Sequence, residues 1–273
     1  MLTYPHIDPV IFHIGPLSVR WYGLMYVLGF MAAYLLARYQ ARKFHWHRME
    51  EHLDNLNLAI ILGVILGGRL GYVLFYNFSY YLHHPVQIFA TWQGGMSFHG
   101  GCLGVLLAGF YYCRRHKLDY WKTADLYVVT VPIGLGLGRI GNFINGELYG
   151  RTSEVPWAMV FPGGGPAPRH PSQLYEAFFE GIILFSILWA VKDKPWRKDH
   201  PWPHGSMLAL FLCLYGTFRF LIEFVREPDP QLGIVFLGMT MGQLLSLAMF
   251  FFGVMLYGFL KRQKKPSFSP GQR

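Results

Sequence analysis

Long apolar segments alternate with short polar segments along most of the chain. The first clear apolar segment spans residues 21–37 and contains no charged side chain. About 20 apolar residues allow a helix to cross the roughly 30 Å hydrocarbon core of a bilayer. Further segments of this kind cover residues 55–76, 97–113, 123–141, 173–191, 206–226 and 233–260. The pattern therefore predicts an all-α, polytopic membrane helix bundle with about seven transmembrane helices.

The same pattern predicts how the chain is organised. Residues 1–273 are expected to form a single integral membrane domain. Within it, residues 142–172 are expected to form a small extracytoplasmic irregular region, and residues 261–273 a basic cytoplasmic tail. Pro132 should shorten or break the span over 123–141. No Lys or Arg precedes Arg20, so the basic segment of a cleaved signal peptide is missing and the first span should be retained.

Composition supports a membrane protein. Hydrophobic residues make up 53% of the chain and charged residues only 14%, against roughly a quarter in an average soluble domain. With a mean hydropathy of +0.27, this excludes a disordered chain or an ordinary cytosolic protein. The three cysteines are scattered through apolar segments, which gives neither a disulfide framework nor a metal-binding pair. They are expected to be small buried core residues: Cys102, Cys113 and Cys213.

Most of the formal net charge of +9 orients the spans. Seventeen of the 24 Lys and Arg residues fall into four segments, 38–48, 114–122, 192–198 and 261–273, which follow alternate spans. Cytoplasmic loops of membrane proteins carry such an excess of Lys and Arg, so these segments should be cytoplasmic and the N-terminus should lie outside. No basic helix face or RNA-binding motif accompanies the charge, and nucleic-acid binding loses its support.

The other seven basic residues are all arginines, although the chain contains nine lysines. Arginine stays charged in apolar surroundings and binds phosphate or carboxylate with a planar fork. The alternative is that arginines pair with acidic residues and tie helices together, which is open for Arg69, Arg151 and Arg169 taken singly. The seven are Arg20, Arg69, Arg139, Arg151, Arg169, Arg219 and Arg226.

Ionisable residues inside membrane spans are costly and are candidates for function. With the predicted orientation, Arg69, His99, Arg139 and Arg219 lie in the outer half of four different spans, where a helix bundle could gather them around one cavity. Gly63, Gly67 and Gly71 follow one another at intervals of four, which indicates close helix packing instead. The histidine pairs at 45/47 and 83/84 lack clustered ligands, so no metal is predicted.

Two further patterns point to a polar cavity. In the span 206–226, four polar residues share one helix face: Tyr215, Arg219, Glu223 and Arg226. An alternative is a ladder in which Arg219, Glu223 and Arg226 satisfy one another. The segment GRIGNFINGELYG (138–150) combines Arg139, Asn142, Asn145 and Glu147 with four glycines, which is typical of irregular backbone lining a cavity. A simple glycine-rich turn is the alternative.

These residues suit an anionic lipid head group. Arginines would bind a departing phosphate, while His99 could accept a proton from a nucleophile, because histidine as a residue type titrates near neutral pH. The chain contains no GxSxG, Walker or HExxH motif. Two alternatives remain, a transporter or flippase of an anionic lipid or solute, and a structural scaffold. No internal repeat typical of transporters is present.

The sequence closely resembles bacterial phosphatidylglycerol–prolipoprotein diacylglyceryl transferases. The resemblance rests on GGMSFHGG (94–101), GRIGNFINGELYG (138–150) and YGTFRFLIEFVREPD (215–229). Three shorter blocks support it across almost the whole chain: WYGLMY (21–26), GGRLGYVLFYN (67–77) and RHPSQLYE (169–176). The stretch 151–168 carries no such block.

The resemblance implies a multi-pass enzyme of the bacterial cytoplasmic (inner) membrane that acts in lipoprotein biosynthesis. It would transfer diacylglycerol from phosphatidylglycerol to the lipobox cysteine of prolipoprotein signal peptides, forming a thioether and releasing glycerol phosphate. The nucleophile is then the substrate's thiol, and no cofactor is implied. The implied partners are phosphatidylglycerol, prolipoprotein signal peptides and membrane lipid.

The resemblance also implies a role for each matching residue. His99, Arg139 and Arg219 are the expected catalytic residues, with His99 as the candidate base. The expected substrate-binding residues are Tyr22, Arg69, Arg139, Asn142, Asn145, Glu147, Gly150, Tyr215, Arg219, Glu223 and Arg226.

Overall fold

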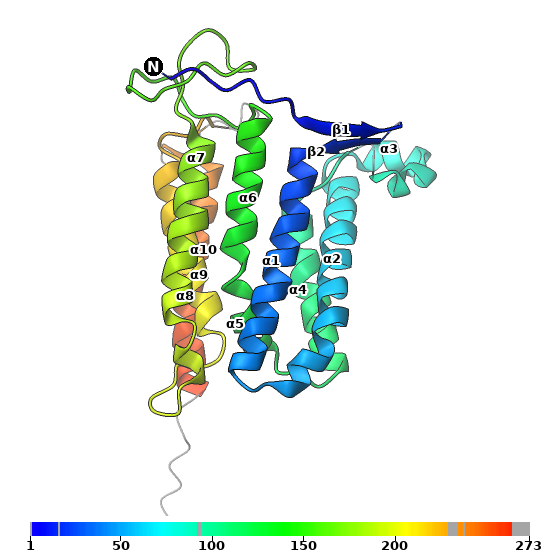
Figure 1. Cartoon of the computed structure of the whole chain (residues 1–273), viewed down its shortest axis with the longest axis vertical. Helices are drawn as coiled ribbons and strands as arrows, with labels where there is room; N and C mark the ends of the chain where they lie inside the picture. Colours follow the sequence, from blue (N-terminus) through cyan, green and yellow to red (C-terminus); the bar gives the residue numbers. More distant parts are fainter. Residues whose placement is uncertain (1, 16, 92–93, 229–233, 237, 264–273) are drawn as a thin grey trace, which may run out of the picture. The chain divides into compact units, whose positions relative to one another are not determined.

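The computed structural model describes residues 2–15, 17–91, 94–228, 234–236 and 238–263, most of which are helical (Figure 1). The chain divides into two compact units, residues 1–37 with 124–273 (unit 1) and residues 38–123 (unit 2). In the described part of the chain, strands form only two short antiparallel hairpins. The predicted helical class is confirmed, whereas the hairpins were not predicted. Part of the expected cytoplasmic tail, 264–273, lies outside the described residues.

Unit 2 is built on a pair of long helices that pack against each other. Its elements are α2 (His47–Phe75), α3 (Phe78–His83), η1 (Pro85–Phe89) and α4 (Phe98–Arg115). The helices α1 (Trp21–Lys43) and α5 (Tyr120–Val128) each belong to both units. At the start of α4, Ser97 caps the helix because its hydroxyl accepts a hydrogen bond from Gly100 N at 3.2 Å.

Glycines bring α2 and α4 close together. A Cβ atom on Gly67 would lie 2.4 Å from the carbonyl oxygen of Gly100, and one on Gly63 would lie 2.6 Å from that of Gly104. On Gly71 it would lie 2.8 Å from Gly100 Cα. Any larger side chain would therefore force the helices apart, and the predicted close packing of this glycine series is confirmed.

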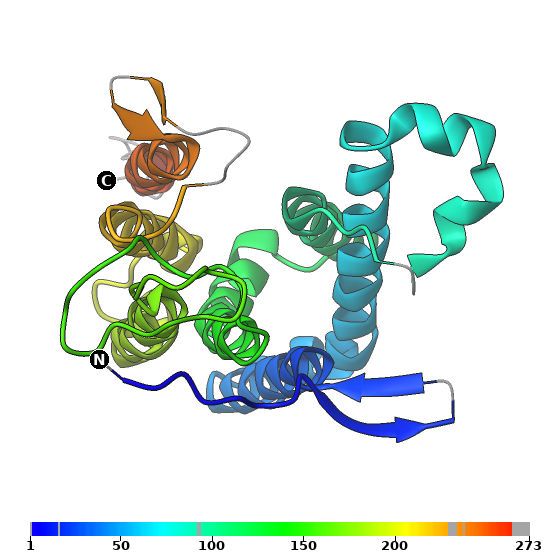
Figure 2. The same cartoon turned by 90° about the horizontal axis from the view of Figure 1, so that it is seen from above.

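Unit 1 contains most of the remaining helices. They are α6 (Val131–Ile144), α7 (Ser172–Glu176), η3 (Ala177–Ile183), α8 (Leu184–Val191), η4 (Lys194–Trp196), α9 (Ser206–Ile222) and α10 (Met241–Gln263). Its hairpins are β1 (Val10–Ile14) with β2 (Leu17–Arg20), and β3 (Ile234–Phe236) with β4 (Met239–Thr240). Seen end-on in Figure 2, α6 lies beside the α7–α8 helix, which lies beside α9, and α9 beside α10.

Local sequence explains two features of these helices. Pro132 stands in the first turn of α6, where its missing N–H costs nothing, and α5 and α6 meet at a bend of 42°. The predicted break at this proline is confirmed.

At the start of α9, the buried Asp125 carboxylate accepts hydrogen bonds from Gly205 N at 2.8 Å and Met207 N at 2.9 Å. It thereby satisfies amide groups that a helix start leaves unpaired.

The segment from α7 to α8 runs on as one helix whose middle, Ala177–Ile183, is π-helical. Glycine lets this π-helical part approach α6, because a Cβ atom on Gly181 would lie 2.8 Å from Gly136 Cα. Such π-helical turns are rare and frequently mark functional sites. The close approach sets the spacing between the polar side chains of α6 and those of η3.

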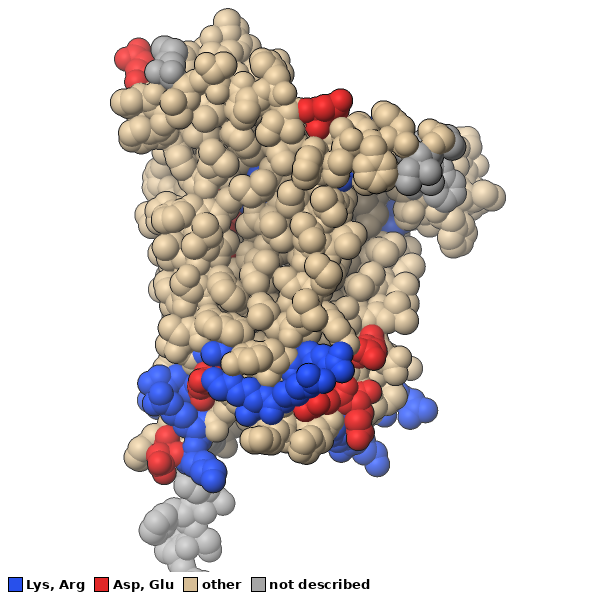
Figure 3. Space-filling model, in the orientation of Figure 1, with Lys and Arg blue, Asp and Glu red and all other residues tan. Residues whose placement is uncertain are grey.

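Three helices in the described part of the chain are long and apolar enough to cross a membrane: His47–Phe75, Ser172–Trp196 and Met241–Gln263. A fourth span results if the bent pair α5–α6 counts as one, and α9 is a shorter apolar helix. A membrane helical protein is thus supported, and the number of seven spans stays a prediction. In Figure 3 the visible sides of the helices are almost free of charged side chains, which gather at helix ends instead.

Candidate functional site

Arg139 lies near the end of α6 and contacts two acidic residues of the neighbouring helix. Its Nε atom is 3.1 Å from Glu176 Oε2, and its Nη2 atom is 3.5 Å from Glu180 Oε2. Both carboxylate side chains are fully buried, whereas 18% of the Arg139 side chain is exposed. The guanidinium group is thus fixed by two carboxylates one helical turn apart.

Glu176 is shared by three arginines. Besides Arg139, it pairs with Arg219 Nη1 of α9 and with Arg226 Nη1, which lies 2.9 Å from Glu176 Oε1. Only 14% of the Arg219 side chain and 10% of the Arg226 side chain are exposed. Glu176 therefore connects α7 to α6, to α9 and to the segment after α9.

Glu223 follows directly after α9 and pairs with Arg219 Nη2 at 2.7 Å. Its other oxygen accepts a hydrogen bond from Thr240 Oγ1 of β4 at 3.0 Å. Arg226 was expected on the same helix face, but α9 ends at Ile222, so Arg226 leaves that face and reaches Glu176. Only the Arg219–Glu223 half of the alternative ladder therefore forms.

We call these six residues the arginine–glutamate cluster: Arg139, Glu176, Glu180, Arg219, Glu223 and Arg226. Its three positive and three negative formal charges cancel. A single unpaired charge in apolar surroundings is strongly unfavourable, and pairing compensates much of that penalty. The buried hydroxyl of Tyr215, one helical turn before Arg219, lies close to Arg139 and completes the polar group.

A second polar group follows at the end of α6. The side-chain amides of Asn142 and Asn145 donate to Glu147 Oε1 at 2.9 and 3.0 Å. The Gln173 amide donates to the Glu147 carbonyl oxygen at 2.6 Å, which connects this group to α7. Asn142 is buried and the Glu147 residue is exposed, so the group extends from the interior to the surface.

The backbone of segment 138–150 is less irregular than its glycines suggested. Residues up to Ile144 continue α6, and only the following residues leave the helix, with φ of +66° at Gly146 and +57° at Leu148. Helices between packed neighbours tolerate glycine because tertiary contacts hold them. At Gly141 the missing side chain has a clear use, since a Cβ atom would lie 2.8 Å from the Tyr22 ring.

Both backbone polar groups of Gly150 form hydrogen bonds. Its N–H donates to the His170 carbonyl oxygen at 2.8 Å, and its carbonyl oxygen accepts from Arg169 Nη1 at 3.2 Å. A Cβ atom would lie 2.5 Å from the Val225 carbonyl oxygen, so only glycine fits. Burial lowers the pKa of His170, which favours its neutral form.

Arg69, in unit 2, binds backbone rather than acidic residues. All five of its N–H groups point to carbonyl oxygens, those of Gln87, Ile88, Ala90, Gly94 and Gly95, at 2.6 to 3.3 Å. Its guanidinium carbon also lies 5.2 Å from the centre of the Tyr81 ring. In this arrangement Arg69 holds the segment after α3 against α2, and a substrate contact stays a prediction.

His99 is exposed in the first turn of α4 and packs edge-on against Phe98, with ring centres 5.7 Å apart. It belongs to unit 2, whereas Arg139 and Arg219 belong to unit 1. That one cavity contains these three residues together with Arg69 therefore stays a prediction.

Arg151 and Arg169 serve the irregular region between α6 and α7. Arg151 Nε donates to the Arg226 carbonyl oxygen at 3.0 Å, and Arg169 Nη1 lies 3.0 Å from Glu227 Oε2. Arg169 thus pairs with an acidic residue, as the alternative expected, but the pair joins two irregular segments rather than two helices. Arg151 instead uses a backbone acceptor.

Sequence reasoning missed Glu176 and Glu180. Both lie in the predicted span 173–191, four residues apart, and an acidic residue in a span is as costly as a basic one. The surplus of arginines pointed to Arg139 and Arg219 but not to their acidic partners. The signal was present: two carboxylates on one face of an otherwise apolar segment.

The cysteines are not uniformly buried. Cys113 is buried and Cys213 is half-buried, but Cys102 is exposed on α4, so its predicted burial is wrong. A helix that faces the hydrocarbon of a membrane carries apolar residues on its outer surface. A cysteine among apolar neighbours is therefore not necessarily buried in protein. In the described residues, no three or more His, Cys, Asp or Glu side chains are placed to bind a metal ion.

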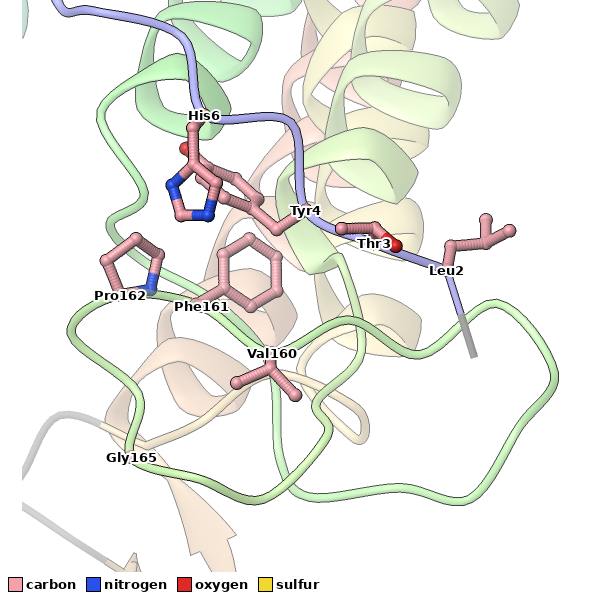
Figure 4. Close-up of a pocket in the computed structure, with 8 residues that line it drawn as sticks. All are labelled: Leu2, Thr3, Tyr4, His6, Val160, Phe161, Pro162 and Gly165. Carbon is pink, nitrogen blue, oxygen red and sulfur yellow. The ribbon is translucent and has the colours of Figure 1, made fainter.

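A pocket of about 470 Å³ lies in the irregular region of unit 1, between the N-terminal segment and residues 160–165 (Figure 4). The Tyr4 hydroxyl anchors its wall by donating to the Phe143 carbonyl oxygen at 2.7 Å. Burial raises the pKa of Tyr4, which keeps this donor neutral. None of the predicted site residues lines the pocket, which is formed by Leu2, Thr3, Tyr4, His6, Val160, Phe161, Pro162 and Gly165.

Comparison with known proteins decides the family. The sequence profile of the prolipoprotein diacylglyceryl transferases matches residues 9–259. The chain belongs to this family. The matched range contains every predicted site residue, from Tyr22 to Arg226, and the resemblance drawn from the sequence blocks is confirmed.

Individual members of the family are similar over nearly their whole length. A protein of Desulfotalea psychrophila is 59% identical over 96% of this chain and 97% of its own. A protein of Geobacter sulfurreducens is 53% identical over 96% of this chain and 99% of its own. A protein of Vibrio cholerae is also 53% identical, over 93% of this chain and 92% of its own. All three are named phosphatidylglycerol–prolipoprotein diacylglyceryl transferase.

Proposed function

We propose that this chain transfers the diacylglyceryl group of phosphatidylglycerol to the lipobox cysteine of prolipoprotein signal peptides. A thioether forms and glycerol phosphate leaves. The observation that carries the proposal is the buried arginine–glutamate cluster of a member of the transferase family. In it, Arg139 and Arg219 are held with little exposure, as required to bind and neutralise a phosphate in low-dielectric surroundings.

The neighbouring groups suit the rest of the head group. Asn142, Asn145 and Glu147 form one hydrogen-bonded set at the end of α6, which leads from the cluster to the exposed surface. Amide and carboxylate groups match the hydroxyl groups of the glycerol head. Tyr22, Gly150, Tyr215, Glu223 and Arg226 would support this site by packing and pairing.

The nucleophile is the thiol of the substrate. A free thiol has a pKa of about 8.5, so it is mostly protonated near neutral pH and must lose its proton to react. We assign His99 as the base that accepts its proton. Replacing His99 with Gln should abolish turnover while phosphatidylglycerol still binds. Retained turnover would remove His99 from the mechanism and leave the positive field of Arg219 to activate the thiol.

We further propose seven spans with the N-terminus outside and the C-terminus in the cytoplasm of the bacterial inner membrane. The support is the distribution of Lys and Arg along the chain. Under this topology the end of α6 and the irregular region after it face outward, where prolipoproteins arrive.

The decisive experiment is turnover by the purified chain in detergent with phosphatidylglycerol and a lipobox peptide. We expect release of glycerol phosphate and a mass gain of one diacylglyceryl group on the peptide thiol. A serine in place of the peptide cysteine is the matched control and should stay unmodified. Lipid binding without release would instead favour a transporter or flippase.

A further inference from the structure

Glu180 is the least satisfied carboxylate of the arginine–glutamate cluster. It is fully buried in η3, and among the residues that the structure describes its Oε1 atom has no hydrogen-bond partner. Its other oxygen reaches Arg139 Nη2 at only 3.5 Å. A buried acceptor without a partner is unusual and calls for an explanation.

The other two carboxylates of the cluster are better paired. Glu176 contacts three guanidinium groups, and Glu223 contacts Arg219 at 2.7 Å and Thr240 Oγ1 at 3.0 Å. Protonation is easiest where the negative charge has the weakest partners. If one carboxylate of the cluster takes a proton, Glu180 is therefore the one that does so.

The charged and titratable groups around Glu180 come from the elements packed against η3. From α6 the group is Arg139, from α7 it is Glu176, and α8 contributes none. From α9 they are Tyr215 and Arg219, with Glu223 at its end. Together with Arg226 and Glu180 itself, these groups sum to zero formal charge when all three carboxylates are ionised.

A bound phosphodiester changes this balance. Its single negative charge would leave the cluster with a net charge of −1, in surroundings that screen charge poorly. Its oxygens would also compete with Glu176 and Glu180 for the N–H groups of Arg139. A proton on Glu180 resolves both conflicts, because it cancels the added charge and frees Arg139 Nη2. It also turns an acceptor oxygen into a donor toward phosphate.

We propose that Glu180 takes up one proton when an anionic phosphodiester lipid binds at Arg139. This inference rests on the proposed function, since it requires the lipid phosphate to occupy the arginine–glutamate cluster. Glu180 then couples lipid binding to a proton, and phosphatidylglycerol affinity depends on pH although the lipid itself does not titrate near neutrality.

The test measures phosphatidylglycerol binding to the full chain in detergent from about pH 6 to about pH 9. The bound state holds one more proton, so affinity should fall as pH rises, by up to about tenfold per pH unit. Calorimetry in two buffers of different ionisation enthalpy should show uptake of about one proton. Diacylglycerol, which lacks the phosphodiester, brings no charge to Arg139 and should cause no proton uptake.

Glu180→Gln should bind phosphatidylglycerol with an affinity that no longer depends on pH. The exposed Glu154→Gln is the matched control and should keep the wild-type dependence. Equal heats in both buffers and pH-independent affinity of the wild-type chain would overturn the inference, even if Glu180→Gln fails to fold. If lipid binding is the same in Arg139→Gln as in wild type, the proposed function itself fails.

Discussion

Arg139 uses separate nitrogens for separate acceptors, Nε for Glu176 and Nη2 for Glu180. A lysine ammonium is a single point charge and cannot keep this geometry while it also binds a phosphate. We expect Arg139→Lys to lower the rate of glycerol phosphate release by about 100-fold or more. The exposed Arg20→Lys serves as control and should keep wild-type activity. Near-normal activity of Arg139→Lys would argue against a bidentate contact between the Arg139 guanidinium group and the phosphate.

Glu176 carries more of the charge balance than any other residue of the cluster, because three arginines share it. Glu176→Ala would leave these guanidinium groups with an uncompensated positive charge in the interior. Breaking a buried pair in this way costs about 3–5 kcal/mol. We expect a loss of this size in the free energy of unfolding in detergent, measured with denaturant. Loss of activity with unchanged stability would contradict this role.

At the residue scale, the sequence singled out Arg139 and Arg219, and the structure places both in the arginine–glutamate cluster, but the sequence did not point to Glu176 or Glu180. Arg139 and Arg219 stood out because arginine in a membrane span is rare. Of their acidic partners, Glu223 lies in the block 215–229 and was predicted, Glu176 closes RHPSQLYE without a predicted role, and Glu180 lies outside every block. Which carboxylate meets which guanidinium depends on how three helices pack, and a single chain pattern does not contain this information.

Among the elements, the contact between α6 and η3 controls the spacing of the cluster. A Cβ atom on Gly181 would lie 2.8 Å from Gly136 Cα, a backbone atom that cannot turn aside. We expect Gly181→Ala to lower the free energy of unfolding by about 1–3 kcal/mol, as overpacking does, and to reduce activity by moving Glu180 from Arg139. Unfolding in detergent and the turnover assay measure the two effects.

Gly134→Ala is the matched control on α6. A Cβ atom there has no heavy atom within 4 Å, so this variant should be as stable as wild type or slightly more stable. Equal stability of Gly181→Ala and Gly134→Ala would show that the α6–η3 contact is loose.

Glycine and proline positions predicted how some of the elements pack and bend. The glycine series on α2 predicted its close packing against α4, and Pro132 predicted the bend before α6. The hairpins were missed because each strand has only two to five residues, too short for an alternating pattern to emerge. The π-helical part of the α7–α8 helix leaves no periodic signal that the sequence could show.

For the whole molecule, the proposed topology is open to a direct test by cysteine labelling in intact cells. Glu154 and Lys198 are both exposed, and the Lys and Arg distribution places them on opposite sides of the membrane. Glu154→Cys should react with a membrane-impermeant maleimide without permeabilisation, and Lys198→Cys only after it. The unsubstituted chain gives the background from its three native cysteines. Reaction of Lys198→Cys in intact cells would contradict the topology.

The arginine–glutamate cluster also constrains how the chain is made. The helix from Ser172 to Trp196 brings two carboxylates into the bilayer, each at a cost of about 2.5–3.5 kcal/mol near its centre. Arg139 precedes this helix and Arg219 follows it, so Glu176 and Glu180 are synthesised between their partners. Insertion of this helix is therefore favourable only together with α6, whose Arg139 compensates one negative charge. The second negative charge is compensated when α9 inserts with Arg219. Membrane insertion of these three segments should thus be a cooperative event rather than three independent ones.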